Sequence, residues 1–254
     1  MHILVTNDDG VNAPGLLALA SEMRSLGQVS VLAPEHNWSA SGHVKTMHRP
    51  LRVKETSLAD GSQAWTSDGA PSDCVALGLL GFIPEKIDLV VSGINPNANI
   101  GHDVTYSGTV TAAMEAVISG VPGIAYSLHA PEDYQGILDY APAARIAHRI
   151  VSALLRTGRL TTQLLNVNIP YLPVDQIKGI LVTHQGLRVY RDRLDRRLDP
   201  RGRPYFWIGG DAPTAIPGEG TDFSAIEGGF VSVTPLHLDL TDFQAMNTLT
   251  EIDW

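Results

Sequence analysis

The chain has 254 residues, of which 44% are hydrophobic, enough to bury a sizeable core in one large domain or one domain with an extension. The formal net charge of -9 disfavours general nucleic-acid binding, including binding to a duplex, because no basic excess exists to neutralise phosphates. The single cysteine, Cys74, excludes an internal disulfide and fits a reducing cytoplasm. We find no signal-peptide pattern and no apolar stretch near the roughly 20 residues that span a bilayer, so we expect a soluble cytoplasmic protein with no membrane partner.

Strand-like and helix-like segments alternate through the first part of the chain. Short segments rich in apolar residues predict strands at residues 3–5, 29–33, 87–92, 123–127, 164–169 and 177–182. Apolar residues at helical spacing predict helices at residues 16–26, 72–80, 109–119 and 143–155. This βαβα alternation predicts an α/β fold in which helices cover both faces of a mostly parallel sheet.

The later part of the chain has a different composition. Residues 188–203 carry seven arginines interleaved with aspartates, and residues 205–208 form a short aromatic run. We interpret this stretch as an extended β-hairpin arm that contacts a partner subunit. A strand returns at residues 230–234, and the tail from residue 241 is compatible with a short helix. We therefore divide the chain into a core domain, residues 1–183, and a C-terminal arm and tail for oligomerisation, residues 184–254.

Two adjacent carboxylates, Asp8 and Asp9, follow the first predicted strand in the sequence NDDG. In an open α/β sheet, ligands bind at the carboxyl ends of the strands. Adjacent acids repel each other, and they suit a hard divalent cation better than they suit packing. An ordinary turn, with one aspartate bonded to the backbone and the other solvated, explains the pair about as well when it is taken alone.

Two polar loops after other strands offer neutral oxygen ligands. The loop NWSASGH contains Ser39, which we prefer as an oxygen ligand rather than a nucleophile because no G-x-S-x-G elbow is present. The loop SGINPNAN contains Asn95, the asparagine nearest the end of its strand. Each loop alone is also typical of a simple polar connection.

The sequence YSGT precedes the predicted helix 109–119. Ser107 or Thr109 is able to cap this helix, and its free N–H groups and dipole would also favour a phosphate. The segment is not a P-loop, since the G-x-x-x-x-G-K-[ST] pattern is missing. No Cys or His cluster has the spacing of a zinc site.

Taken together and in order, these segments resemble the SurE family of metal-dependent 5′/3′-nucleotidases, known as survival proteins. The matching segments are ILVTNDDG at 3–10, SASGH at 39–43, DLVVSGIN at 88–95, DVTYSGTVTAAMEA at 103–116 and TDFSAIEGGFVSVTPLHLDLT at 221–241. The region from about 130 to 204 contributes little to the resemblance.

The resemblance implies a Rossmann-like three-layer core, a smaller C-terminal part with a β-hairpin exchanged between subunits, and a homodimer or tetramer. It implies one divalent cation per subunit, Mg²⁺ or Mn²⁺, with ligands at Asp8, Asp9, Ser39 and Asn95. It places around the substrate phosphate Asn99, Ser107, Gly108 and Thr109. The implied reaction is hydrolysis of nucleoside 5′- or 3′-monophosphates to nucleoside and phosphate, and some members also cleave short polyphosphate.

One position departs from the family pattern, and several alternatives stay open. The family usually has glycine where this chain has Asn97, which suggests a backbone with positive φ that asparagine tolerates. A haloacid-dehalogenase-like phosphatase would place one residue between its aspartates, whereas Asp8 and Asp9 are adjacent. A nucleotide- or metal-binding regulator without turnover fits the same residues. The nucleophile is either water, which we prefer, or a carboxylate of Asp8.

Overall fold

The computed structural model describes residues 1–131 and 134–254. Within this part of the chain one sheet has the strand order β3-β4-β2-β1-β5-β6-β7-β11-β8. Its strands are β1 (His2–Thr6), β2 (Gln28–Pro34), β3 (Val53–Ser57), β4 (Gln63–Ser67), β5 (Leu89–Asn95), β6 (Gly123–His129), β7 (Leu164–Pro170), β8 (Ile180–Val182) and β11 (Val231–Leu236). From β4 to β7 all neighbouring pairs are parallel, and β3 and β11 run antiparallel to β4 and β7. The expected mostly parallel sheet is confirmed.

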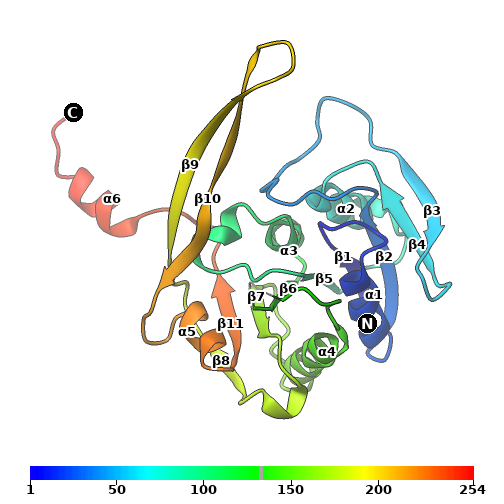
Figure 1. Cartoon of the computed structure of the whole chain (residues 1–254). Helices are drawn as coiled ribbons and strands as arrows, with labels where there is room; N and C mark the ends of the chain where they lie inside the picture. The colour runs from blue at the N-terminus through cyan, green and yellow to red at the C-terminus, as the bar shows by residue number, and fades with distance from the viewer. Residues whose placement is uncertain (132–133) are drawn as a thin grey trace.

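Helices cover both faces of this sheet and make three layers (Figure 1). Alternation along the buried strand β1 sends Ile3 and Val5 into one core and Leu4 into the other. The first core includes α1 (Pro14–Met23) and α4 (Ala141–Arg156), and the second includes α2 (Pro71–Leu77) and α3 (Gly108–Ile118). Cys74 is fully buried on α2. Because both faces of the central strands are buried, those strands are rich in apolar residues.

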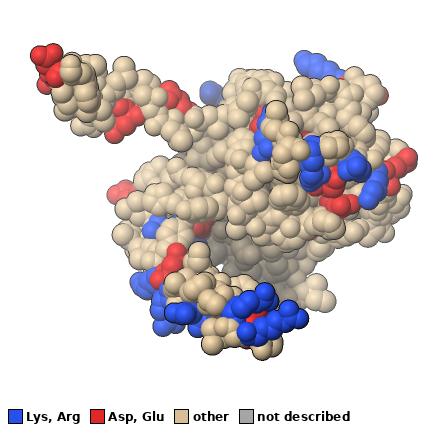
Figure 2. All heavy atoms as spheres, turned by 90° about the horizontal axis from the view of Figure 1, so that it is seen from above, with Lys and Arg blue, Asp and Glu red and all other residues tan. Residues whose placement is uncertain are grey.

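The C-terminal part contains the predicted arm. The strands β9 (Leu187–Leu198) and β10 (Pro204–Ile216) form a separate antiparallel ribbon that projects from the body (Figure 1). Basic side chains gather over this arm (Figure 2). After α5 (Asp222–Glu227) the chain returns to the main sheet as β11, and α6 (Phe243–Leu249) lies in a tail that extends away from the body. Within the described residues, no helix is long and apolar enough to cross a membrane.

Several elements differ from the sequence-based expectations. The antiparallel pair β3 and β4 at the sheet edge was not predicted, because β3 is mostly solvent-exposed and lacks an apolar run. The expected strand 177–182 is confined to β8. Short helical turns lie at η1 (Gly78–Phe82), η2 (Gly101–Thr105) and η3 (Val174–Gln176). The expectation of a positive φ at Asn97 is wrong, since Ala40 is the residue other than glycine that has one in the described part of the chain.

Candidate functional site

The NDDG turn at the end of β1 is closed by the side chain of Asn7. Its carboxamide oxygen accepts from the N–H of Gly10 at 3.2 Å, and its amide nitrogen donates to the carbonyl of Gly10 at 3.0 Å. Gly10 has φ +102°, a conformation that L side chains rarely adopt. This closed turn holds Asp8 and Asp9 at the carboxyl edge of the sheet, where Asp8 is only 3% exposed.

The first turn of α3 packs directly against Asp8. The hydroxyl of Thr109 donates to Asp8 Oδ1 at 2.5 Å, and the backbone N–H of Thr109 also donates to this carboxylate. A Cβ at Gly108 would lie 2.7 Å from the Cβ of Asp8, so only glycine allows this close approach. Gly108 and Thr109, which the resemblance assigns to the phosphate, therefore also hold Asp8 in place.

Burial disfavours the ionisation of both carboxylates. Burial raises the pKa of Asp8, and the hydrogen bonds from Thr109 oppose that rise. Burial and then the negative charge of Asp8 raise the pKa of Asp9 to about 7. A bound cation would reverse this effect, because it favours the ionised form of both groups.

The loop that carries Ser39 meets the acids through its backbone and through Asn37. The N–H of Trp38 donates to the carbonyl of Asp8 at 2.7 Å, and Asn37 Nδ2 lies 3.4 Å from Asp9 Oδ1. Asn37 Oδ1 also accepts from the N–H of Ser39 at 2.7 Å. Ser39, which is exposed, therefore directly follows two residues that contact the acids.

Asn95 ends β5, which pairs with β1 in parallel, so that both strands end at the same edge of the sheet. The Nδ2 of Asn95 donates to the carbonyl of Asn97 at 2.6 Å. This bond fixes the orientation of the carboxamide and leaves its oxygen, the atom that a hard cation would use, outside that bond.

Asn99 and Ser107 already have partners within the protein. Asn99 Nδ2 donates to Ser127 Oγ at 2.8 Å, and the backbone of Asn99 is bonded to Asn168 and Asn166, all within the buried interior. The hydroxyl of Ser107 accepts from the N–H of Val110 at 3.1 Å and caps α3, the simpler of its two expected roles. The contacts of Asn99 and Ser107 with a phosphate stay predictions.

A buried acid that we did not predict connects α3 to the Ser39 loop. Glu115 Oε2 lies 3.0 Å from His43 Nε2, and Oε1 lies 2.9 Å from Lys45 Nζ. The Glu115 side chain is only 5% exposed. The sequence does contain a signal, because Glu115 is the single charged residue in the apolar helix α3. Asn166, Asn168 and Ser127 were missed as well, since polar residues inside β6 and β7 do not reveal their partners.

The donor set fits a hard divalent cation. Every predicted ligand atom is oxygen, from two carboxylates, a hydroxyl and an amide. No group of three or more His, Cys, Asp and Glu residues is arranged to hold a metal in the part of the chain that the structure describes. A cation at Asp8 and Asp9 would accordingly be completed by neutral oxygens and water.

Comparison with known proteins points to one family. A family model described as "Survival protein SurE" matches residues 3–192. The chain is 50% identical to the "5′-nucleotidase SurE" of Herpetosiphon aurantiacus over 100% of this chain and 99% of that protein, and 48% identical to that of Chloroflexus aggregans over 100% of both. The crystal structure of a SurE protein from Aquifex aeolicus aligns with a TM-score of 0.81 and 41% identity over 98% of both chains. The chain therefore belongs to the SurE family.

Proposed function

We propose that this protein is a divalent-metal-dependent phosphomonoesterase that hydrolyses nucleoside 5′- and 3′-monophosphates to nucleoside and phosphate. The observation that carries the proposal is the adjacent pair of the buried Asp8 and the partly buried Asp9, with Asp8 held against the N-terminus of α3. Relatives named 5′-nucleotidase that align along the whole chain support the nucleotide substrate. Cleavage of short polyphosphate stays a prediction.

The proposed ligands of one Mg²⁺ or Mn²⁺ per subunit are Asp8, Asp9, Ser39 and Asn95. When bound, the cation would supply positive charge that neutralises the phosphate and polarises its oxygens. Thr109 would keep the Asp8 carboxylate oriented through its hydroxyl and N–H. The N–H groups and dipole at the start of α3 would hold the remaining phosphate oxygens beside Ser107, Gly108 and Asn99.

In the proposed reaction a water molecule attacks phosphorus. A new P–O bond forms, the ester P–O bond breaks, and the nucleoside leaves with a proton that the water gave up. In this proposal Asp8 would orient the water or accept its proton, and the support is that its carboxylate is fixed from one side by α3. A phosphate trapped covalently on Asp8 during turnover would contradict water as the nucleophile.

The test is phosphate release from AMP and GMP with Mg²⁺ or Mn²⁺. We expect turnover that EDTA abolishes, that added metal restores, and that Asp8→Asn eliminates. The alternative is a nucleotide- or metal-binding regulator. Tight nucleotide binding without turnover under any divalent cation would establish that alternative and contradict the proposed hydrolase.

We also propose a cytoplasmic homodimer or tetramer assembled through the arm. The β9–β10 register places on one face of the ribbon Leu194 opposite Ile208, with Leu198 and Phe206 nearby on that face. These four side chains are between 52% and 82% exposed. Apolar side chains in such a row favour burial against another chain, and the interleaved aspartates and arginines suit a polar rim.

A further inference from the structure

A second buried carboxylate lies apart from the acid pair, in the first turn of α5. Asp222 is fully buried. Its Oδ2 accepts from the backbone N–H of Gly101 at 2.8 Å, and its Oδ1 accepts from those of Gly186 and Phe223, both at 2.8 Å. A buried carboxylate needs such hydrogen bonds, because burial removes it from water. Asp222 therefore joins α5 to two segments that lie 121 and 36 positions earlier in the sequence.

These bonds go beyond what α5 itself requires. Thr221 already caps the helix, because its hydroxyl accepts from the N–H of Ser224 at 3.2 Å. The N–H of Asp222 donates to the carbonyl of His184 at 2.8 Å, which holds Asp222 against the segment before β9. Two of the three bonds to the carboxylate come from outside the helix, so Asp222 acts as a connection between segments.

Gly101, the first residue of η2, is held from two sides. Its N–H is bonded to Asp222, and its carbonyl accepts from Gln185 Nε2 at 2.8 Å. Gly101 has φ +54°, and a Cβ there would collide with the carbonyl oxygen of Gly186, so the two backbones touch. Asp222 and the segment before β9 therefore determine where η2 begins.

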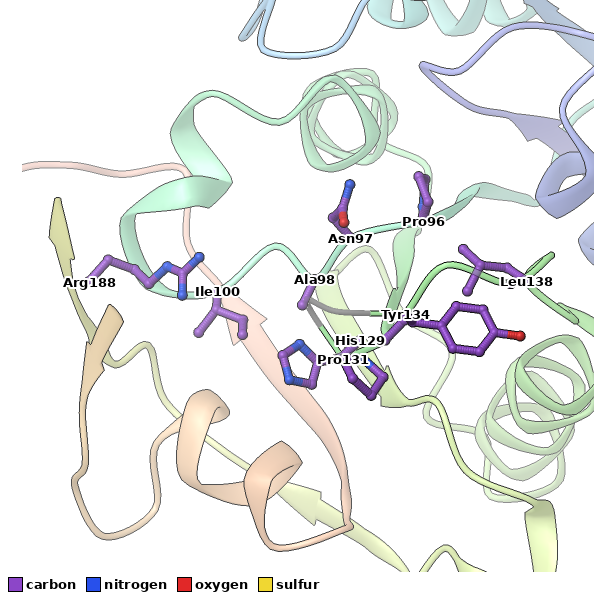
Figure 3. A pocket seen from close by; sticks show the side chains of 11 residues that line it. Pro96, Asn97, Ala98, Ile100, His129, Pro131, Tyr134, Leu138 and Arg188 are labelled. Carbon is purple, nitrogen blue, oxygen red and sulfur yellow. The ribbon is translucent and has the colours of Figure 1, made fainter. Parts of the chain in front are cut away.

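A further contact holds η2 against the base of the arm. Asp103 Oδ1 accepts from the hydroxyl of Tyr190 at 2.5 Å, and Arg188 Nε lies 2.9 Å from Asp103 Oδ2. Arg188 extends from the start of β9 toward Ile100, which directly precedes Gly101 (Figure 3). The short helix η2 is thus packed against the first residues of β9.

The η2 helix leads directly into the predicted phosphate site. The carbonyl of Asp103 accepts from the N–H groups of Tyr106 and Ser107 at 3.0 and 3.1 Å, and Ser107 caps α3. The carbonyl of Tyr106 accepts from the N–H of Gly42, in the loop that carries Ser39, at 2.9 Å. A displacement of η2 would therefore move the start of α3, where we expect the phosphate to bind.

We propose that Asp222 is a positioning residue for the phosphate-binding end of the site. It fixes η2, and through η2 the orientation of Ser107 and of the start of α3, relative to the base of the arm. The inference rests on the proposed phosphomonoesterase function. Because the proposed cation ligands lie outside η2, the role of Asp222 predicts an effect on phosphate binding and turnover that exceeds any effect on cation binding.

The test is Asp222→Asn, which keeps the shape of the side chain but turns an NH₂ group toward N–H donors. The control is Asp88→Asn, because Asp88 Oδ2 also accepts a backbone N–H, that of His2 at 2.9 Å, and Asp88 precedes β5 at the end of the sheet opposite the site. We expect Asp222→Asn to lower kcat/KM for AMP at least about tenfold. The Kd for inorganic phosphate, measured by titration calorimetry in saturating Mg²⁺, should rise at least about fivefold. The Kd for Mn²⁺ should change less than about twofold, and Asp88→Asn should leave all three values unchanged.

Hydrogen exchange separates positioning from a loss of overall stability. Exchange at residues 101–107 should be faster in Asp222→Asn than in the wild type, whereas exchange in β1 and β5 should not change. Faster exchange throughout the chain, or equal losses of Mn²⁺ and phosphate affinity, would show general loosening and overturn the proposal. An unchanged affinity for phosphate would overturn it as well.

A milder variant, Gln185→Ala, guards against misfolding of Asp222→Asn. Gln185 is exposed, and the change removes its bond to the carbonyl of Gly101. Gln63→Ala is the control, since Gln63 is also exposed and its Nε2 donates to Glu55 at 2.8 Å. We expect the Kd for phosphate to rise about twofold or more in Gln185→Ala only. If Asp222→Asn does not fold, an unchanged Kd in Gln185→Ala would overturn the proposal.

The outcome is separable from failure of the proposed function. If the wild-type protein releases no phosphate from AMP, the phosphomonoesterase proposal fails, but phosphate binding and hydrogen exchange remain measurable. Weaker phosphate binding and faster exchange at residues 101–107 in Asp222→Asn would then still support the positioning role. Absence of phosphate binding to the wild type, or unchanged exchange at residues 101–107, would overturn the inference on its own.

Discussion

Replacing Glu115 by glutamine should loosen the loop that carries Ser39. The carboxylate accepts from His43 at 3.0 Å and from Lys45 at 2.9 Å, and its side chain is 5% exposed. Glutamine keeps the shape, but it loses the charge and turns an NH₂ group toward one of the two donors. A hydrogen bond to a charged group contributes about 1.5–3 kcal/mol.

Solvent screening reduces this hydrogen-bond contribution, because the side chains of the two partners, Lys45 and His43, are 54% and 31% exposed. We therefore expect the free energy of unfolding to fall by about 1–3 kcal/mol. Urea unfolding in EDTA measures this change. Glu85→Gln is the control, since Glu85 is exposed on the loop before β5.

The same substitution should weaken the cation site, because His43 lies four residues after Ser39. We expect Mn²⁺ affinity, measured by titration calorimetry at pH 7.5, to decrease at least about threefold, since a loop that is no longer anchored must be ordered on binding. Stability and Mn²⁺ affinity both matching those of Glu85→Gln would refute the anchoring role of Glu115.

Three further predictions concern the acid pair and the arm. Gly108→Ala should abolish Mn²⁺ binding and turnover, because its Cβ would lie 2.7 Å from that of Asp8; a fully active variant would show that α3 shifts freely. The pKa of Asp9 is raised from 3.8 to about 7, so its protonated form stabilises the metal-free fold at low pH, and that contribution is lost as pH rises through about 7. Saturating Mg²⁺ should accordingly raise Tm more at pH 8 than at pH 6, and a pH-independent increase in thermal scans would contradict the coupling. Leu194→Glu combined with Ile208→Glu should lower the mass measured by light scattering, whereas an unchanged mass would remove the arm's apolar face from the interface.

The sheet could be predicted from the sequence because its strands are buried on both faces. Runs such as residues 3–5 and 89–91 are apolar throughout, and glycine or proline marks many of the strand ends. The edge pair β3 and β4 could not be predicted in the same way. Three of the five β3 residues are exposed, so solvent rather than the core determines their identity.

The two carboxylates of the site could also be predicted from the sequence, since adjacent acidic residues at the end of a strand indicate a cation site by themselves. Asp8 and Asp9 needed no knowledge of distant residues. Glu115 and Asn168 were different, because a polar residue inside a helix or strand does not reveal its partner. Asn168 is hydrogen-bonded to Asn99, which lies 69 positions earlier in the sequence. The parallel pairing of β6 with β7 and the course of the loop after β5 create this contact.

The contacts around Asp8 suggest why stability and function are coupled at this edge of the sheet. The carboxylate is buried, its neighbour Asp9 carries the same charge, and Thr109 satisfies only part of its hydrogen-bonding capacity. Ionisation of the Asp8 carboxyl group therefore costs free energy unless a positive charge lies nearby. A divalent cation at the proposed site would remove that cost and supply the positive charge that a phosphate requires in a protein of net charge -9. A substitution that removes one of the two negative charges, such as Asp9→Asn, should therefore stabilise the metal-free protein while it weakens cation binding.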